Sequence, residues 1–155
     1  MLAIIEDAGH TQYDAVQVLG LATKALKKSA RLDPNAQYIE ETNGNKFLYN
    51  HDILAAQILF LQSGAHLKRA NELIQEFTAD HDRKEFSRTV RSDLRNALAA
   101  AQKATQYQPN DLRYLNRLAL AQRENNQRWK ARQTVRAILK LDPGNVDALT
   151  LRNNL

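Results

Sequence analysis

The chain has 155 residues, 43% of them hydrophobic and 25% charged, which predicts one soluble globular domain with a substantial core. It contains no cysteine, so disulfides, thiolate catalysis and cysteine-ligated metals are excluded. The net charge is +5, and residues 111–155 hold nine Lys and Arg against four Asp and Glu, so positive charge is expected to gather in the last third. Frequent alanine and leucine, with only 6% aromatic residues, favour helices over strands.

The first ten residues, MLAIIEDAGH, have no basic start and carry acidic residues early, so no secretory signal peptide is predicted in this segment. No run of about 18 apolar residues occurs, so no membrane span is predicted. Cytoplasm and periplasm both remain open as compartments, because a helical domain of this size needs no disulfides.

A helix is predicted from about residue 12 to residue 31, followed by a stop at Asp33-Pro34, because the residue before proline avoids the helical conformation. Its lysine-rich C-terminal end complements the helix dipole. Its buried stripe recurs at helical spacing and consists of Ala15, Leu19, Ala22 and Leu26.

Residues 36–50 form the least regular stretch. We predict a short helix over 36–42, a turn at Asn43-Gly44-Asn45, and a return to the core through Phe47 and Leu48. A hairpin around the same turn is the alternative, and it is disfavoured because an isolated hairpin is marginally stable.

Residues 51–80 are predicted to form a pair of helices. The first is apolar nearly all round up to Leu61, and Ser63-Gly64 is expected to end it, with glycine in the position after the helix. The second helix is predicted from helical spacing of Leu67, Ala70, Ile74 and Phe77.

Residues 83–108 are predicted to form one long helix, because a clean apolar stripe runs through them without glycine or proline. Residues 112–145 are predicted to form two short helices, with a turn at Asn125-Asn126 and a stop at Asp142-Pro143. Two short amphipathic helices with so tight a joint should fold antiparallel to bury their apolar faces. A last helix within 146–155 should cap the open end.

Residues 112–145 resemble one tetratricopeptide repeat and match its usual length of about 34 residues. Pro109 and Pro143 are separated by one repeat length, and so are Ala97 and Ala131. The residues that carry the resemblance are Leu118-Ala119, Ala131, Val135 and Pro143. The sequence departs from the family pattern in that the family often has an aromatic residue at Leu115, glycine at Ala119 and tyrosine at Gln122. The resemblance implies an all-α single domain of antiparallel helix-turn-helix repeats, an α-solenoid, with an irregular N-terminal segment and a partial repeat half at 12–35.

The resemblance also implies where a partner would bind. In this family the first helix of each pair lines a groove that holds an extended peptide. The groove positions would be Arg113, Asn116, Arg117, Leu120 and Arg123 in the later pair, and Asp52, Ala55, Leu59 and Gln62 in the earlier one. Arg113 and Arg117 stand where the subfamily that clamps terminal carboxylates has basic residues. A complete clamp is not expected, because Ala55 and Leu59 stand where that subfamily has a lysine and an asparagine.

A line of four cations is predicted from spacing alone, since Arg128, Arg132, Arg136 and Lys140 follow one another at intervals of four residues. Such a line favours an acidic partner, and the alternative is that the arginine stems only cover apolar surface. Arg88, Arg91 and Arg95 form a second, weaker row. Trp129 is predicted to pack on a neighbouring helix, with an exposed docking role as the alternative.

No catalytic, cofactor or metal site is predicted. The four histidines, His10, His51, His66 and His81, are expected at exposed helix ends and lack metal-ligand spacing, and no nucleophile, phosphate-loop or dinucleotide motif occurs. Asp80-His81-Asp82 are adjacent residues that project to different sides.

The sequence therefore predicts a non-enzymatic module or scaffold that binds a protein or peptide, with an acidic partner as one option. One alternative is a basic helical module that binds nucleic acid, which the pI near 9.6 allows and the lack of aromatic residues among the arginine rows disfavours. The other is an accessory assembly domain of a larger envelope or enzymatic protein. Partner identity and oligomeric state stay open.

Overall fold

The computed structural model describes residues 12–42, 45–77 and 83–155. In chain order its elements are α2 (Gln12–Leu32), β1 (Tyr38–Thr42), β2 (Asn45–Tyr49), α3 (His51–Glu76), α4 (Arg83–Tyr107), α5 (Leu112–Glu124), α6 (Arg128–Leu141) and α7 (Val146–Asn153). The prediction that the chain is built of helices is confirmed for this part, with one hairpin as the exception. Within the same residues, no helix is both long and apolar enough to cross a bilayer.

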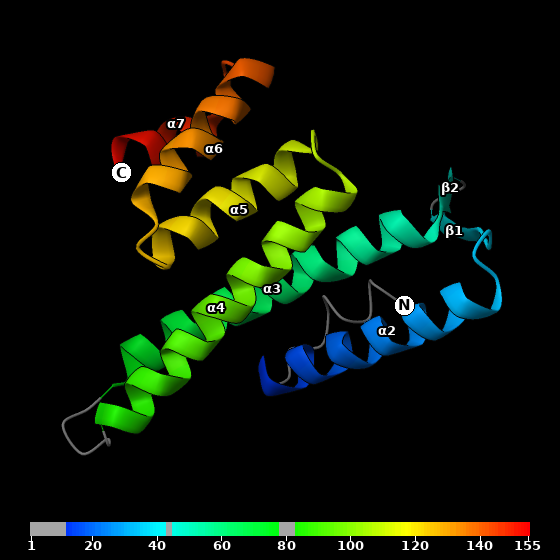
Figure 1. Ribbon diagram of the computed structural model, residues 1–155, viewed down its shortest axis with the longest axis horizontal. Helices are drawn as coiled ribbons and strands as arrows, with labels where there is room; N and C mark the ends of the chain where they lie inside the picture. The colour runs from blue at the N-terminus through cyan, green and yellow to red at the C-terminus, as the bar shows by residue number, and fades with distance from the viewer. Residues whose placement is uncertain (1–11, 43–44, 78–82) are drawn as a thin grey trace.

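Neighbouring helices along the chain are also neighbours in space (Figure 1). The long helices α3 and α4 lie side by side and run in opposite directions, with α2 on the other flank of α3. The shorter helices α5, α6 and α7 follow at the end of α4 that is remote from Arg83. The connections α4–α5, α5–α6 and α6–α7 are each only a few residues long. Each helix therefore packs on the next one and buries one face against it.

The predicted helix over 36–42 is wrong. Residues 38–49 form an antiparallel hairpin in which Tyr38 pairs with Tyr49 and Thr42 pairs with Asn45. Aromatic and β-branched residues favour extended backbone, and a two-residue link of Asn-Gly composition suits a tight hairpin. Contact between β2 and α3 supplies support that an isolated hairpin lacks. The link at 43–44 and the side chains of Phe47 and Leu48 lie outside the described part.

The predicted break at Ser63-Gly64 is also wrong, because α3 runs without interruption from His51 to Glu76. Both small residues serve packing instead of a helix end. Ser63 is fully buried, and a Cβ added to Gly64 would come within 3.3 Å of the Arg117 guanidinium. Ile74, expected on a buried stripe of a second helix, is 51% exposed. Contacts with helices on both flanks override the local cost of glycine within a helix.

The interface between α3 and α4 contains a buried charge cluster. Asp93 of α4 is fully buried, and its carboxylate accepts hydrogen bonds from His66 Nδ1 at 2.9 Å and from Arg69 Nε at 2.7 Å, with a further ion pair to Arg69 Nη2. His66 is therefore a mid-helix packing residue and not the exposed helix-end histidine that was predicted. Burying a carboxylate requires such partners, and here α3 provides both.

The α5–α6 pair has an apolar interior that α7 completes. Ala119, Val135, Ile138 and Ala148 are fully or almost fully buried and form one cluster with Leu151. Asp111 caps the start of α5 by accepting from the Arg113 backbone N–H at 2.9 Å. The helix pair predicted over 112–145 is confirmed, and Asn126 adopts a left-handed backbone (φ 58°) in its turn.

The turn between α5 and α6 is tied to the preceding pair. The Asn125 side-chain amide donates to the Leu94 carbonyl of α4 at 2.7 Å and to the Ala121 carbonyl at 2.8 Å. Gln122 is buried and accepts a hydrogen bond from Thr134 Oγ1 at 2.8 Å. The polar residues at the end of α5 therefore fix its position against both α4 and α6.

Candidate functional site

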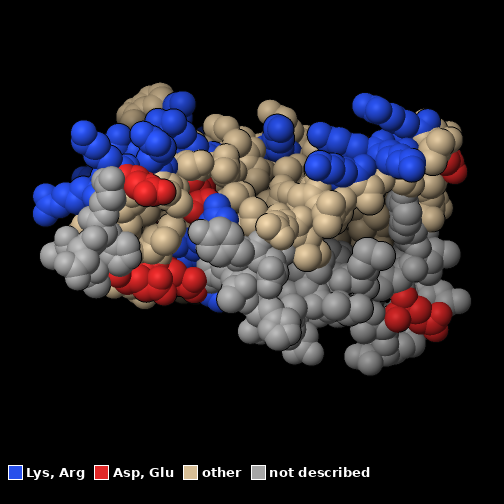
Figure 2. Space-filling view, turned by 90° about the horizontal axis from the view of Figure 1, so that it is seen from below, with Lys and Arg blue, Asp and Glu red and all other residues tan. Residues whose placement is uncertain are grey.

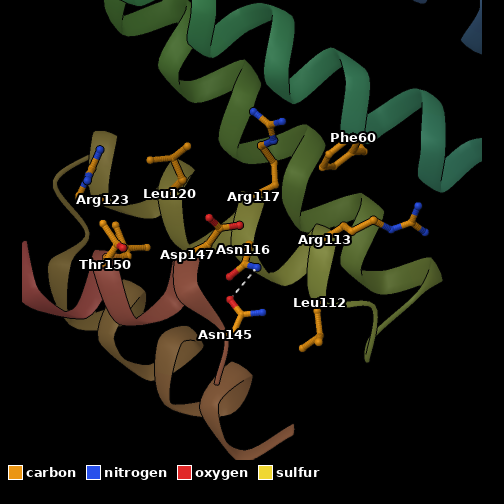
Figure 3. Close-up of a pocket in the computed structure, with 11 residues that line it drawn as sticks. Phe60, Leu112, Arg113, Asn116, Arg117, Leu120, Arg123, Asn145, Asp147 and Thr150 are labelled. Carbon is orange, nitrogen blue, oxygen red and sulfur yellow. Dashed lines mark hydrogen bonds between the residues drawn. The ribbon is translucent and has the colours of Figure 1, made fainter. Parts of the chain in front are cut away.

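A hollow of about 620 Å³ lies where α5, α7 and the middle of α3 meet. Its wall combines apolar side chains with three arginines, two asparagines and one aspartate. The lining residues, all drawn in Figure 3, are Phe60, Leu112, Arg113, Asn116, Arg117, Leu120, Arg123, Asn145, Asp147, Thr150 and Leu151.

All five groove positions predicted on the later pair line this hollow: Arg113, Asn116, Arg117, Leu120 and Arg123. They share one face of α5 because they recur at intervals of three and four residues. The opposite face carries Leu115, which packs against the cluster formed with α6 and α7, and the buried Gln122, which is hydrogen-bonded to Thr134 of α6. Packing of α5 on the helices behind it therefore directs these five side chains into the hollow.

Two of the three arginines already have carboxylate partners. Arg113 Nη2 lies 2.6 Å from Asp111 Oδ2, and Arg123 Nη2 lies 2.5 Å from Glu124 Oε1. The hydrogen bond from the Arg113 side chain lowers the pKa of Asp111, and the same pairing raises the pKa of Arg113. These two guanidinium groups are largely neutralised within α5 and its cap.

Arg117 is in a different situation. Its guanidinium carbon lies 4.7 Å from the centre of the Phe60 ring, and its terminal nitrogens approach Gly64. Burial lowers the pKa of Arg117, and no carboxylate of the described residues lies within ion-pair distance of it. Phe60 in turn packs against the buried Tyr114, with ring centres 5.5 Å apart. Arg117 is thus a cation held in place by aromatic contact and still available to an anion.

A pair of asparagines crosses the hollow from α5 to α7. Asn116 Nδ2 donates to Asn145 Oδ1 at 3.1 Å, and the same oxygen accepts from the Ala148 backbone N–H at 3.1 Å (Figure 3). Asn145 Nδ2 donates to Asp142 Oδ2 at 3.2 Å, which fixes the orientation of the Asn145 amide. The Asn116 amide is therefore oriented as well, and its Oδ1 has no hydrogen-bond partner in the described part of the chain.

The groove positions predicted on the earlier pair do not join the hollow. Asp52 is exposed in the first turn of α3, and Gln62 donates to Thr23 Oγ1 of α2 at 3.0 Å. Ala55 and Leu59 line a separate hollow of about 480 Å³ between α2, α3 and α4. The reason is that α2 packs along α3 and occupies that part of its surface.

The four-residue line of cations lies on the outer side of α6, away from the hollow. Arg128, Arg132, Arg136 and Lys140 are all exposed, and Arg132 Nη2 donates to the Leu155 carbonyl at 2.5 Å. The prediction that Trp129 packs on a neighbouring helix is wrong, because its side chain is 68% exposed. The inner face of α6 is already filled by smaller apolar residues, so no space for an indole remains there.

The weaker arginine row lies on α4. Arg88, Arg91 and Arg95 line an open hollow of about 530 Å³ together with Arg83, Lys84 and Ser87. Figure 2 shows Lys and Arg side chains gathered in two groups along one edge of the molecule, one at each end.

Sequence reasoning missed the part of the hollow that α3 and α7 contribute. Asp147 and Thr150 of α7 follow Arg113 and Asn116 by one repeat length, and Asn145 follows the cap Asp111 by the same interval. Extending the repeat by one further unit would therefore have identified them. No such signal marks Phe60, which enters from a helix whose course was predicted incorrectly.

No group of three or more potential metal ligands occurs within the described ranges 12–42, 45–77 and 83–155. His10 and the Asp80-His81-Asp82 run lie outside these ranges. Comparison of the chain with protein-family models, with curated proteins and with solved structures gave no match. The functional argument therefore depends on the geometry of the hollow and of the surfaces around it.

Proposed function

We propose that the protein is a tetratricopeptide-like interaction module that holds an extended, carboxylate-bearing peptide segment in the hollow between α5 and α7. In this interpretation α3–α4 and α5–α6 are two successive repeats and α7 begins a third. The offset of one repeat length supports it, since Ala97 and Ala131 are both fully buried and Asp111 and Asn145 both cap helices. The first helices of the second and third units then line the hollow.

Arg117 is the observation that carries the proposal. Its guanidinium is partly buried, held over Phe60 and without a carboxylate neighbour among the described residues. A charge-assisted hydrogen bond to a guanidinium is about twice as strong as a neutral one, and it is strongest where water is partly excluded. A carboxylate of the peptide bound at Arg117 would supply the missing counter-charge.

The neighbouring groups favour a peptide over a simple anion. Leu120 and Phe60 offer apolar contact on either side of the arginine, and the Asn116 side chain adds an amide to the same wall. Asp147 places one negative charge in the same hollow, which opposes a dense polyanion. A single carboxylate on an otherwise neutral or mixed-charge chain fits this arrangement.

The test is an array of ten-residue peptides in matched pairs that carry either one central Glu or one central Gln. We expect a preference for the Glu member, and loss of that preference in Arg117→Gln, with binding weakened about tenfold or more. Arg95→Gln removes the same charge from the outer face of α4 and is the matched control. Equal binding of both peptide series by the wild type and by Arg117→Gln would refute the proposal.

A further inference from the structure

The outer face of α6 combines an exposed indole with cations. At 100° per residue, Trp129, Gln133, Arg136 and Lys140 fall within a narrow stripe, because they recur at intervals of four, three and four. All four are exposed, and Lys130 and Arg132 flank the stripe. The stripe is opposite the buried side chains of Ala131, Val135 and Ile138, so α6 cannot rotate to bury it.

The cations of this helix lack acidic neighbours. The α6 sequence RWKARQTVRAILKL contains five Lys and Arg and no Asp or Glu. The four acidic residues of 111–155 are used elsewhere: Asp111 and Glu124 pair with Arg113 and Arg123, Asp142 binds the Gly144 and Asn145 nitrogens, and Asp147 lines the hollow. No Asp or Glu of the described residues lies within ion-pair distance of an α6 cation, and Arg132, which donates to the Leu155 carbonyl, lies beside the stripe and not in it. The charge of this face is therefore left for an external anion.

We propose that this face of α6 binds single-stranded nucleic acid, with phosphates on the Arg136 and Lys140 side of the stripe and one base stacked on Trp129. Cations at four-residue intervals follow the helix axis at steps of about 6 Å, so they can contact successive phosphates of an extended strand. The exposed indole supplies the aromatic platform whose apparent absence from the arginine rows argued against nucleic acid at the level of sequence.

Two other anionic partners fit this face less well. A membrane surface requires several apolar side chains along the face that enters the lipid, whereas here one indole shares the stripe with Gln133, Arg136 and Lys140. An acidic protein segment would satisfy the cations but would leave the 68% exposed indole without a role. A strand that carries both phosphates and flat bases matches both kinds of side chain.

The α6 face and the hollow lie on different surfaces. None of the residues that line the hollow belongs to α6, since they come from α3, from α5 and from the segment of Asn145 and α7. Binding of a strand to α6 is therefore independent of the proposed peptide site, and Arg117→Gln should leave it unchanged. The two proposals can fail separately.

Trp129 is the single tryptophan of the chain, so its fluorescence reports this face without labelling. We expect oligo(dT) and oligo(rU) of twelve nucleotides to quench this fluorescence. The oligonucleotide that binds with the higher affinity shows whether the face prefers DNA or RNA. An abasic twelve-nucleotide phosphodiester should bind about tenfold more weakly and leave the emission nearly unchanged, because stacking of a base is lost.

Variants separate stacking from charge. Trp129→Ala should weaken binding of a labelled oligo(dT) about tenfold, measured by anisotropy. Arg136→Gln/Lys140→Gln should reduce the slope of log affinity against log salt by about 1.4, since each phosphate contact on a single strand contributes about 0.7. The control Arg88→Gln/Arg91→Gln removes the same charge from α4 and should leave quenching intact. All these residues are exposed, and circular dichroism checks that each variant is folded.

Two results would overturn the proposal. The first is unchanged Trp129 emission at oligonucleotide concentrations that saturate anisotropy, because it would place the strand on another face. The second is no binding of either oligonucleotide at about 50 mM salt, where phosphate contacts are strong, while vesicles of phosphatidylserine and phosphatidylcholine shift the emission to the blue, which would assign the face to a membrane surface.

Discussion

The helix pairs α3–α4 and α5–α6 bring two helices together by different means. The interface of α3 and α4 contains the fully buried Asp93 with its partners His66 and Arg69. The interface of α5 and α6 is closed by aliphatic side chains such as Val135 and Ile138, with one polar link between Gln122 and Thr134. Each pair has one fully buried alanine at corresponding positions, Ala97 in α4 and Ala131 in α6. A similar close approach of two helices is therefore accompanied by a buried charge cluster in the first pair and by apolar burial in the second.

This difference has a consequence for tolerance to substitution. A buried charge cluster depends on every member, because removal of one partner leaves the others desolvated and unpaired. An aliphatic interface loses stability in proportion to the volume removed, and its neighbours can partly relax into the space. The first pair should therefore be sensitive at a single position, and the second at several positions with smaller individual effects.

The largest effect is expected at Asp93. Asp93→Ala should lower the free energy of unfolding by about 3–5 kcal/mol, because Arg69 would remain partly buried without its counter-charge and His66 without its hydrogen-bond acceptor. Asp93→Asn keeps the shape and part of the hydrogen bonding and should cost less. Denaturation in urea measures both. A loss below about 1 kcal/mol for Asp93→Ala would show that the charge cluster does not hold α3 and α4 together.

The second largest effect is expected in the apolar pair. Ile138→Ala should cost about 3 kcal/mol, because it removes a fully buried side chain and leaves a cavity between α5, α6 and α7. Leu141→Ala on the same helix is the control, since Leu141 is exposed and the change should stay within about 0.5 kcal/mol. Equal losses at the two positions would contradict the burial described for α6.

An effect of about 1 kcal/mol is expected at Asp111, which caps α5. Asp111→Ala should destabilise by that amount, whereas Asp52→Ala, at an exposed first-turn position without a cap bond in the structure, should cost less. The pKa of Asp111 is lowered in the folded protein, chiefly by the Arg113 side chain. A lowered folded pKa stabilises above the unfolded value, so the difference between wild type and Asp111→Ala should shrink as pH falls below about 4. Thermal melts from pH 3 to pH 7 measure this trend.

The smallest effect on stability is expected at Gly64, where α3 meets the hollow. Gly64→Ala should stabilise the fold by less than about 1 kcal/mol. The added Cβ would lie 3.3 Å from the Arg117 guanidinium, so the guanidinium must shift, and this cost offsets part of the gain in helix propensity. Gly20→Ala in α2 is the matched control, since nothing lies within 4 Å of its added Cβ and the full gain should appear. Gly64→Ala should also weaken binding of the Glu peptides, and Gly20→Ala should not. An equal gain at both glycines with unchanged peptide binding would remove the link between α3 and the hollow.

Sequence periodicity was sufficient for α4 to α7, because each of these helices has its apolar residues on one side and ends at a proline or an asparagine turn. It failed at Gly64, where the signal for a helix end was local, whereas α3 is supported through this region by contacts with α2, α4 and α5. The prediction for residues 38–49 failed for the same reason, since the hairpin there is supported by contact with α3. Contacts distant in sequence decided both regions.

The candidate site likewise has a part that was predictable from one helix and a part that depends on contacts between helices. The five α5 residues were predictable, because one helix determines which side chains share a face. The contributions of Phe60 and Asp147 depend on how three helices meet. The four positions predicted on α3 lie apart from this hollow, and Leu59 and Gln62 among them face α2. The periodicity of α6 places Trp129 on the side away from Ala131 and Val135, but whether another helix covers that side depends on how the helices assemble.

Asn145 performs two tasks with a single oxygen atom, since its Oδ1 accepts both from Ala148 N–H, at the start of α7, and from Asn116 across the hollow. A guest that immobilises the Asn116 amide therefore also steadies the acceptor on which the first turn of α7 depends. Amide hydrogen exchange at Ala148 should slow when the hollow is filled, although Ala148 itself is buried and never meets the guest. The exchange rate at the start of α7 thus reports whether the hollow is occupied.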